Sequence, residues 1–159
     1  MQEKKLKQEN STIPLEHMWS VFCTASSIDQ QTNNVTLFSV IEQINATRKK
    51  DAPLIDVKNG EPLPVQMELV TLWRKLGLDE KISASCDYVL ISPLGKEIAR
   101  QNVPIEISSI SKRLRTKMQI NGIRATGPGY YTWQLLVKYK GMEEILGSAS
   151  FELVLDTEK

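Results

Sequence analysis

The chain has few of the residue types that most active sites need. It contains one histidine, His17, and two cysteines, Cys23 and Cys86, in 159 residues. No cysteine or carboxylate recurs around His17 at the spacing of a metal site or of an activated nucleophile. The carboxylates are scattered along the chain rather than gathered in one motif. We therefore expect no catalytic residue, no metal site and no cofactor site, and we expect that the protein is not an enzyme.

A charge excess and long apolar runs are missing as well. The net charge is +1, so the molecule as a whole does not attract nucleic acid or anionic membranes strongly. No run approaches the roughly 20 apolar residues that cross a bilayer, and the polar residues 1–11 lack the apolar middle of a signal peptide. We expect a cytoplasmic protein without membrane or nucleic-acid partners. In that compartment thiols stay reduced, so we expect no disulfide between Cys23 and Cys86.

Length and composition suit one globular domain. The hydrophobic share is 41% and the charged share 25%, which are ordinary values for a folded domain. A chain of this length buries roughly 70% of the surface that it exposes when unfolded. The first residues are mostly charged or polar and end at Pro14. We predict a flexible tail over residues 1–14, or a short amphipathic helix in its place, and a single domain over residues 15–156.

The clearest pattern in the chain is an alternating segment near its C-terminal end. After a Gly-Pro-Gly turn at 127–129, large side chains occupy every second position, namely Tyr131, Trp133, Leu135, Val137 and Tyr139. Period-two alternation of this length is typical of a strand with one face in a core and the other near water. The segment therefore predicts a strand whose odd-numbered residues face inward.

Seven further segments also have strand patterns. They are residues 17–25, 35–44, 65–74, 81–92, 97–107, 112–123 and 146–155. The segment 35–44 is apolar on both faces, which predicts a position well inside a sheet. Pro104 cannot donate a ladder hydrogen bond, so we place the strand 97–107 at a sheet edge. About eight short strands without a helical pattern predict an all-β, antiparallel β-sandwich.

The residues at the start of the C-terminal strand pair make the fold prediction more specific. In immunoglobulin-like domains the penultimate strand opens with a Gly-x-Tyr pattern, and the tyrosine hydroxyl bonds back to the preceding turn. The segment Gly129-Tyr130-Tyr131-Thr132-Trp133 is similar, with Tyr131 in the corner position. Trp133 stands where antibody domains keep their second cysteine, so the resemblance is to immunoglobulin-like topology and not to an antibody domain.

The order of motifs from His17 to Leu155 also resembles a family of short bacterial proteins with an immunoglobulin-like β-sandwich. The motifs are the strand 19–24, the segment Asn33-Asn34-Val35-Thr36-Leu37-Phe38-Ser39-Val40-Ile41, the Ile-Ser-Pro-Leu-Gly-Lys hairpin at 91–96, and the segment 127–133. The resemblance implies the fold and a bacterial origin. It implies no activity, cofactor or catalytic residue.

Two sets of side chains could contact a partner. Arg113, Arg115 and Lys117 share the face of one strand opposite Leu114 and Met118. This basic stripe could contact an anionic partner, or it could be a solvated face that discourages edge pairing. Separately, four aromatic residues could line a ligand pocket or fill the core; these are Trp19, Trp73, Tyr88 and Trp133.

These observations favour a binding role over a catalytic one. We expect a non-enzymatic protein-interaction module of a bacterial cytoplasm, which binds a protein partner or associates with itself through an edge strand. The alternative is a small-molecule or carbohydrate binding protein that uses an aromatic-lined pocket.

Overall fold

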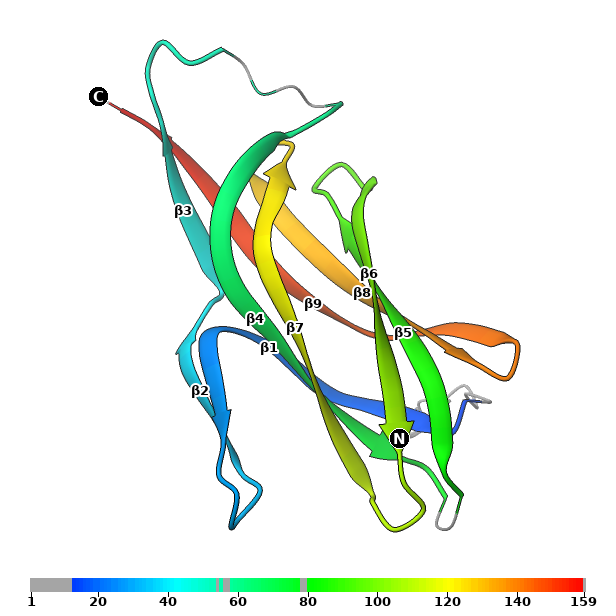
Figure 1. Ribbon diagram of the computed structural model, residues 1–159. Helices are drawn as coiled ribbons and strands as arrows, with labels where there is room; N and C mark the ends of the chain where they lie inside the picture. The colour runs from blue at the N-terminus through cyan, green and yellow to red at the C-terminus, as the bar shows by residue number, and fades with distance from the viewer. Residues whose placement is uncertain (1–12, 54, 56–57, 78–79, 159) are drawn as a thin grey trace, which may run out of the picture.

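The computed structural model describes residues 13–53, 55, 58–77 and 80–158. Within these ranges the chain forms nine strands in two sheets and no helix (Figure 1). The strands are β1 (Leu15–Ile28), β2 (Val35–Val40), β3 (Gln43–Arg48), β4 (Glu61–Lys75), β5 (Ile82–Ile91), β6 (Glu97–Ile107), β7 (Arg113–Ala125), β8 (Gly129–Tyr139) and β9 (Met142–Thr157). Among the described residues there is also no helix with the length and apolarity that crossing a membrane requires.

One sheet has four strands and the other has five. The four-stranded sheet has the order β2-β1-β4-β7, and the five-stranded sheet has the order β3-β9-β8-β5-β6. The prediction of an all-β sandwich is confirmed. The expectation of purely antiparallel strands is wrong at one place, because β3 pairs with β9 in parallel. The five-stranded sheet is therefore mixed.

The predicted strand 35–44 is two strands. Its first part is β2, at an edge of the four-stranded sheet, and its second part belongs to β3, at an edge of the five-stranded sheet. Ser39 has a φ of 48°, a left-handed conformation that turns the chain. The prediction that this segment lies well inside a sheet is wrong, since Phe38 is 50% and Val40 56% exposed. The segment lacks a polar face because it changes sheets, not because both of its faces are covered.

The core lies between the two sheets. The inward residues predicted for β8 are buried, and Tyr131 stacks on Phe151 of β9, which meets Phe22 of β1 edge to face. The predicted tyrosine corner is confirmed. The Tyr131 hydroxyl donates a hydrogen bond to the Gly127 carbonyl (2.7 Å) and accepts one from the Thr126 amide (2.8 Å).

Two further predictions concern Pro104 and the N-terminal segment. Pro104 lies in β6, which is an edge strand as predicted, although the proline does not interrupt it. Of the predicted tail over residues 1–14, positions 1–12 lie outside the described residues. Ile13 is buried in the core, and the Pro14 carbonyl accepts a hydrogen bond from the Leu76 amide (2.9 Å). Ile13 and Pro14 are therefore packed against the domain and are not part of a flexible tail.

Candidate functional site

The basic stripe lies on one face of β7 as predicted, but two of its three cations have partners within the molecule. Arg115 donates hydrogen bonds to the side-chain oxygen (3.0 Å) and the carbonyl (2.6 Å) of Asn33. Lys117 forms an ion pair with Glu68 of β4 (3.4 Å). Arg113 is exposed. Within the stripe, Arg115 therefore has a structural task, which is to hold the β1–β2 hairpin.

This hairpin folds onto the outer face of the four-stranded sheet. Ile28 and Val35 border a cavity of about 240 Å³ together with Val70, Arg115 and Lys117. Ser26 Oγ donates a hydrogen bond to Glu68 (2.6 Å), the carboxylate that also pairs with Lys117. Val70 and Leu72 are buried although they alternate with the core residues of β4. The hairpin thus covers apolar surface that a two-layer sandwich leaves open to water.

Three of the four aromatic side chains fill the core. Trp73, Tyr88 and Trp133 are buried, and Trp19 is half-buried on β1. The hydroxyl of Thr116 accepts a hydrogen bond from Trp73 Nε1 (3.0 Å) and contacts the Tyr88 hydroxyl (2.8 Å). For these three residues the core-filling interpretation is confirmed.

His17 and the cysteines lie in apolar surroundings. The His17 ring is half-buried, meets Trp73 edge to face at 5.7 Å, and forms a hydrogen bond with Ser20 Oγ (2.8 Å). Burial lowers the pKa of His17. Cys23 and Cys86 are free and buried, and burial raises the pKa of the Cys86 thiol to about 12. A thiol with so high a pKa is a poor nucleophile. In the described ranges no group of three His, Cys, Asp or Glu side chains is placed to hold a metal ion.

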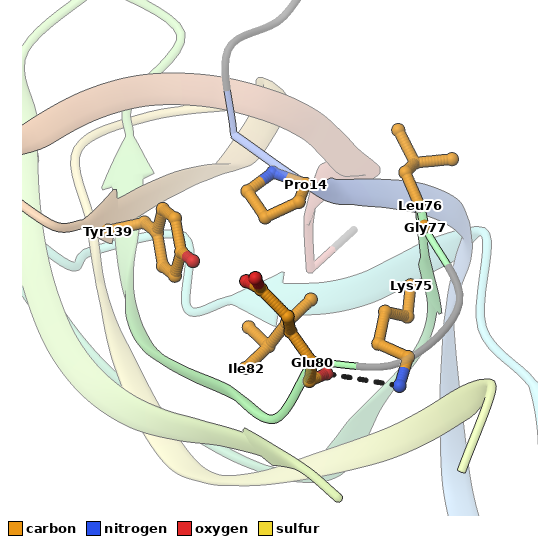
Figure 2. A pocket seen from close by; sticks show the side chains of 7 residues that line it. All are labelled: Pro14, Lys75, Leu76, Gly77, Glu80, Ile82 and Tyr139. Carbon is orange, nitrogen blue, oxygen red and sulfur yellow. Dashed lines mark hydrogen bonds between the residues drawn. The ribbon is translucent and has the colours of Figure 1, made fainter. Parts of the chain in front are cut away.

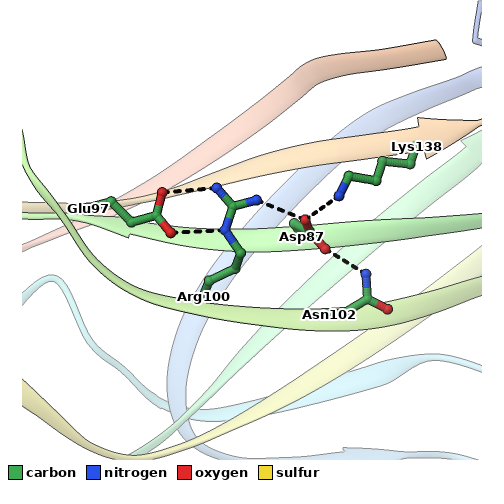
Figure 3. Close-up of polar contacts among 5 residues, drawn as sticks. All are labelled: Asp87, Glu97, Arg100, Asn102 and Lys138. Carbon is green, nitrogen blue, oxygen red and sulfur yellow. Dashed lines mark hydrogen bonds and ion pairs between the residues drawn. The ribbon is translucent and has the colours of Figure 1, made fainter. Parts of the chain in front are cut away.

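A polar network surrounds Asp87 on the outer face of the five-stranded sheet (Figure 3). One carboxylate oxygen accepts hydrogen bonds from Lys138 of β8 (2.7 Å) and Arg100 of β6 (2.9 Å), and the other accepts one from Asn102 (2.6 Å). Arg100 also pairs with Glu97. The hydrogen bond from Lys138, followed by that from Asn102, lowers the pKa of Asp87 to about 2. Because both oxygens are engaged and the group stays ionised, Asp87 ties three strands together and is a poor acid–base catalyst.

A cavity of about 270 Å³ lies at one end of the sandwich, bordered by Lys75, Glu80, Ile82 and Tyr139 (Figure 2). Lys75 is buried there, and its ammonium group donates to the carbonyls of Glu80 (3.1 Å), Ser108 (3.1 Å) and Ser109 (2.9 Å). An ammonium group has three donors, so these carbonyls use all of them. Lys75 therefore joins two loops and has no donor left for a ligand.

A larger groove lies between β6 and β7, where the two sheets face each other with unpaired edges. It has a volume of about 690 Å³ and is lined by residues 62–64 of β4, by Ile98 and Ala99 of β6, and by residues 121–124 of β7. The two strands approach each other, but in the described part of the chain no ladder joins them. We call this feature the β6–β7 groove.

The shape of the groove follows from local irregularities. The β4–β7 register shifts between Leu63 and Gln66, and Gly122, with a φ of 109°, lies opposite this bulge. Ala99 pairs with the buried Leu90, so it points to the inner side of its sheet, yet it is exposed. The inner face of β6 is thus open to the groove at this end. Arg124 is the one charged residue among those that line the groove.

The groove was not predicted from the sequence. Pro62, Pro64 and Gly122 are signals of an irregular strand pair, and they could have indicated a bulge at this position. They could not indicate that β6 faces β7, because that depends on the strand order of two separate sheets.

The fold is similar to that of known structures, whereas no protein-family model matches the chain and no curated protein is similar in sequence. An immunoglobulin-like protein from Pseudomonas aeruginosa aligns with 89% of this chain over 92% of its own length, at 12% identity and a TM-score of 0.38. The alkylpurine DNA glycosylase AlkC from Pseudomonas fluorescens, bound to DNA containing an abasic site analog, aligns at 14% identity and a TM-score of 0.44. A family 123 glycoside hydrolase from Clostridium perfringens aligns at 13% identity and a TM-score of 0.34.

These similarities concern the fold alone. The chain covers 31% of the glycosylase and 27% of the hydrolase.

Proposed function

We propose that this protein is a non-enzymatic binding module that takes up an extended segment of a partner protein in the β6–β7 groove. One observation carries the proposal, namely that a groove with apolar walls lies between two edge strands that face each other without a ladder. Unpaired strand edges bind extended peptides through main-chain hydrogen bonds, and adjacent pockets select every second side chain.

The lining of the groove suggests the chemistry of the bound segment. Leu63, Ile98 and Ile123 offer apolar contacts, so every second residue of the segment would be aliphatic or aromatic. Arg124 is the charged group of the lining, and a guanidinium binds carboxylates well. We therefore expect the segment to carry an aspartate or glutamate at one end.

The edge of β6 is suited to this role along its first half. Pro104, which cannot donate to a ladder, lies toward the other end of the strand, whereas Ala99 borders the groove. A partner strand would therefore pair with the first half of β6.

The test is a selection of displayed random peptides on the wild-type protein, followed by affinity measurements on Ala99→Arg. An arginine at this exposed position fills the groove, and burying its charge without a partner costs at least about 1 kcal/mol, so binding should weaken at least about fivefold. Ser148→Arg is the matched control, since Ser148 is an exposed strand residue of β9 outside the groove.

The selected peptides should have an apolar residue at every second position and carry a carboxylate. Arg124→Glu should also weaken their binding. Amide exchange of β6 and β7 should slow when the peptide binds. The proposal is wrong if no selected peptide distinguishes wild type from Ala99→Arg, or if Ser148→Arg loses binding equally.

We also infer that the chain belongs to the family of short bacterial immunoglobulin-like proteins and acts in the cytoplasm. The order of the motifs at 19–24, 33–41, 91–96 and 127–133 supports the family. A match of this chain to a sequence profile built from that family, over the span 17–155, tests the assignment.

A further inference from the structure

The chain contains two Asn-Gly pairs, and both are near the β6–β7 groove. Asn121-Gly122 lines the groove, and Asn59-Gly60 comes just before β4, whose residues 62–64 border it. An asparagine followed by glycine is the pair most prone to lose its side-chain amide, because glycine has no side chain that shields its backbone nitrogen or restricts its rotation. Both asparagines are exposed, so access to water does not distinguish the two pairs.

The loss of the amide needs no reagent except water. The backbone nitrogen of the glycine bonds to Cγ of the asparagine, and the side-chain nitrogen takes up the proton of the backbone amide and leaves as ammonia. Water then adds to one of the two carbonyl groups of the cyclic imide and breaks the bond from that carbonyl carbon to the nitrogen. The product is aspartate or isoaspartate, and either one carries a new carboxylate.

The backbone distinguishes the two pairs. Asn121 lies within β7 opposite Gln66, and β7 pairs with β4 on both sides of this dipeptide, at Ile120 and at Ile123. Ring closure needs a rotation of the asparagine backbone that brings the next nitrogen to Cγ, and residues of a paired strand open rarely. Asn59 lies in a turn outside the strands. We therefore expect ring closure at Asn59 and not at Asn121.

The glycine of the turn has a structural reason. Gly60 has a φ of 66°, a left-handed conformation that favours glycine. A Cβ at this position would lie 3.1 Å from Cβ of Arg124 and 3.2 Å from the carbonyl oxygen of Ala125. The turn therefore approaches β7 closely, and this approach requires the residue that makes Asn59 reactive.

The new carboxylate would lie beside Arg124. Nη1 of Arg124 donates a hydrogen bond to the carbonyl oxygen of Asn59 at 3.5 Å. A carboxylate on the same residue comes within reach of the guanidinium, which binds carboxylates through charge-assisted hydrogen bonds. Arg124 is the one charged residue among those that line the groove, so the modification would change the charge of the groove at its only charged position.

We infer that Asn59 is a site of spontaneous deamidation and that the resulting carboxylate pairs with Arg124. The modification does not depend on the proposed function, whereas its consequence for binding rests on that function. In a groove that holds an acidic segment, the new carboxylate competes with the carboxylate of the segment for Arg124. Deamidation of the turn therefore weakens binding.

The first experiment follows the wild-type protein by peptide mass spectrometry during incubation in warm, mildly alkaline buffer. The peptide with Asn59 should gain about 1 Da, the difference between a hydroxyl and an amino group, and should react in an isoaspartate-specific methylation assay. The peptide with Asn121 should keep its mass in the folded protein and gain the same mass in denaturant. Asn59→Gln is the matched control, because a glutamine keeps the amide but closes its larger ring slowly. An unmodified Asn59, or equal rates at Asn59 and Asn121 in the folded protein, would overturn the inference.

The second experiment tests the pairing with Arg124 and needs no peptide. Asn59→Asp introduces the carboxylate directly, and its titration is followed by nuclear magnetic resonance. The carboxylate should titrate at a lower pH in Asn59→Asp than in Asn59→Asp/Arg124→Gln, because a neighbouring positive charge favours the ionised form. Equal midpoints in the two variants would overturn the pairing.

The third experiment measures the consequence for the groove with the selected peptides. Asn59→Asp should weaken an acidic peptide roughly two- to fivefold, the range of an exposed ion pair, and Asn59→Gln should leave its affinity unchanged. If Asn59→Asp binds the peptide as tightly as the wild type while Arg124→Glu weakens it, the inferred consequence is wrong and the proposed function stands. If no peptide depends on the groove, the proposed function is wrong, and the mass spectra and the titration still decide whether Asn59 is modified and pairs with Arg124.

Discussion

Arg115 on β7 binds Asn33 at the tip of the β1–β2 hairpin through two hydrogen bonds, although 82 positions separate the two residues. Asn33 has a φ of 55°, a left-handed conformation that asparagine tolerates. The guanidinium therefore binds the left-handed turn residue through both its side chain and its backbone, and it holds the hairpin on the outer face of the sheet.

Replacement of Arg115 should loosen this hairpin. We expect Arg115→Ala to lower the free energy of unfolding by about 1 kcal/mol, the usual net value of such hydrogen bonds, and to speed amide exchange in β2. Arg113→Ala on the same stripe is the control and should change stability by less than about 0.5 kcal/mol. Urea unfolding of both variants measures the difference. Equal losses in the two variants would contradict a specific role for Arg115.

The tyrosine corner should contribute measurably to stability. Tyr131→Phe removes the acceptor of the Thr126 amide and the donor to the Gly127 carbonyl in a buried place. We expect a loss of about 1–3 kcal/mol, because buried polar groups remain without partners. Tyr130→Phe, one residue earlier and 63% exposed, is the matched control. The prediction is wrong if thermal unfolding places the two variants at the same midpoint.

The Asp87 network should make stability depend on pH in the acid range. The folded-state pKa of Asp87 is lowered from 3.8 to about 2. A lowered pKa means that this contribution is complete above about pH 4 and is lost as the pH falls from about 4 through 2. Asp87→Asn removes the charge, so it should destabilise the protein at pH 7 and flatten the acid limb of the stability curve. An unchanged acid limb, measured by urea unfolding at several pH values, would exclude the network as its source.

Gly147 should not tolerate a side chain. A Cβ built at this position clashes with the imidazole ring of His17, which packs against Trp73. Gly147→Ala should therefore destabilise the protein by about 1–3 kcal/mol, the usual range for overpacking.

Removal of the ring tests this explanation. The double variant His17→Ala/Gly147→Ala should lose less free energy of unfolding than the sum of the losses in the two single variants, because the alanine at position 147 then has room. Additive losses in denaturant unfolding would mean that Gly147 is needed for another reason.

The fold could be predicted where the pattern is local. The alternation of β8 placed Tyr131 and Trp133 in the core, since successive side chains of a strand point to opposite faces. The same logic placed Arg113, Arg115 and Lys117 on one face of β7. The prediction for the segment 35–44 was wrong because apolar residues on both faces of a strand pattern have two possible causes. Both faces are buried, or the segment changes from one sheet to the other. Periodicity alone does not distinguish these causes.

The amino-acid sequence by itself determined that this chain is a β-sandwich, roughly where most of its strands lie, and which side chains fill its core. These properties follow from alternation and turn chemistry, which act between near neighbours. Only the tertiary structure decided that Arg115 meets Asn33, that β6 faces β7 across a groove, and that β2 is an edge strand. These relationships depend on the order of strands in two sheets, and contacts between residues far apart in the chain determine that order.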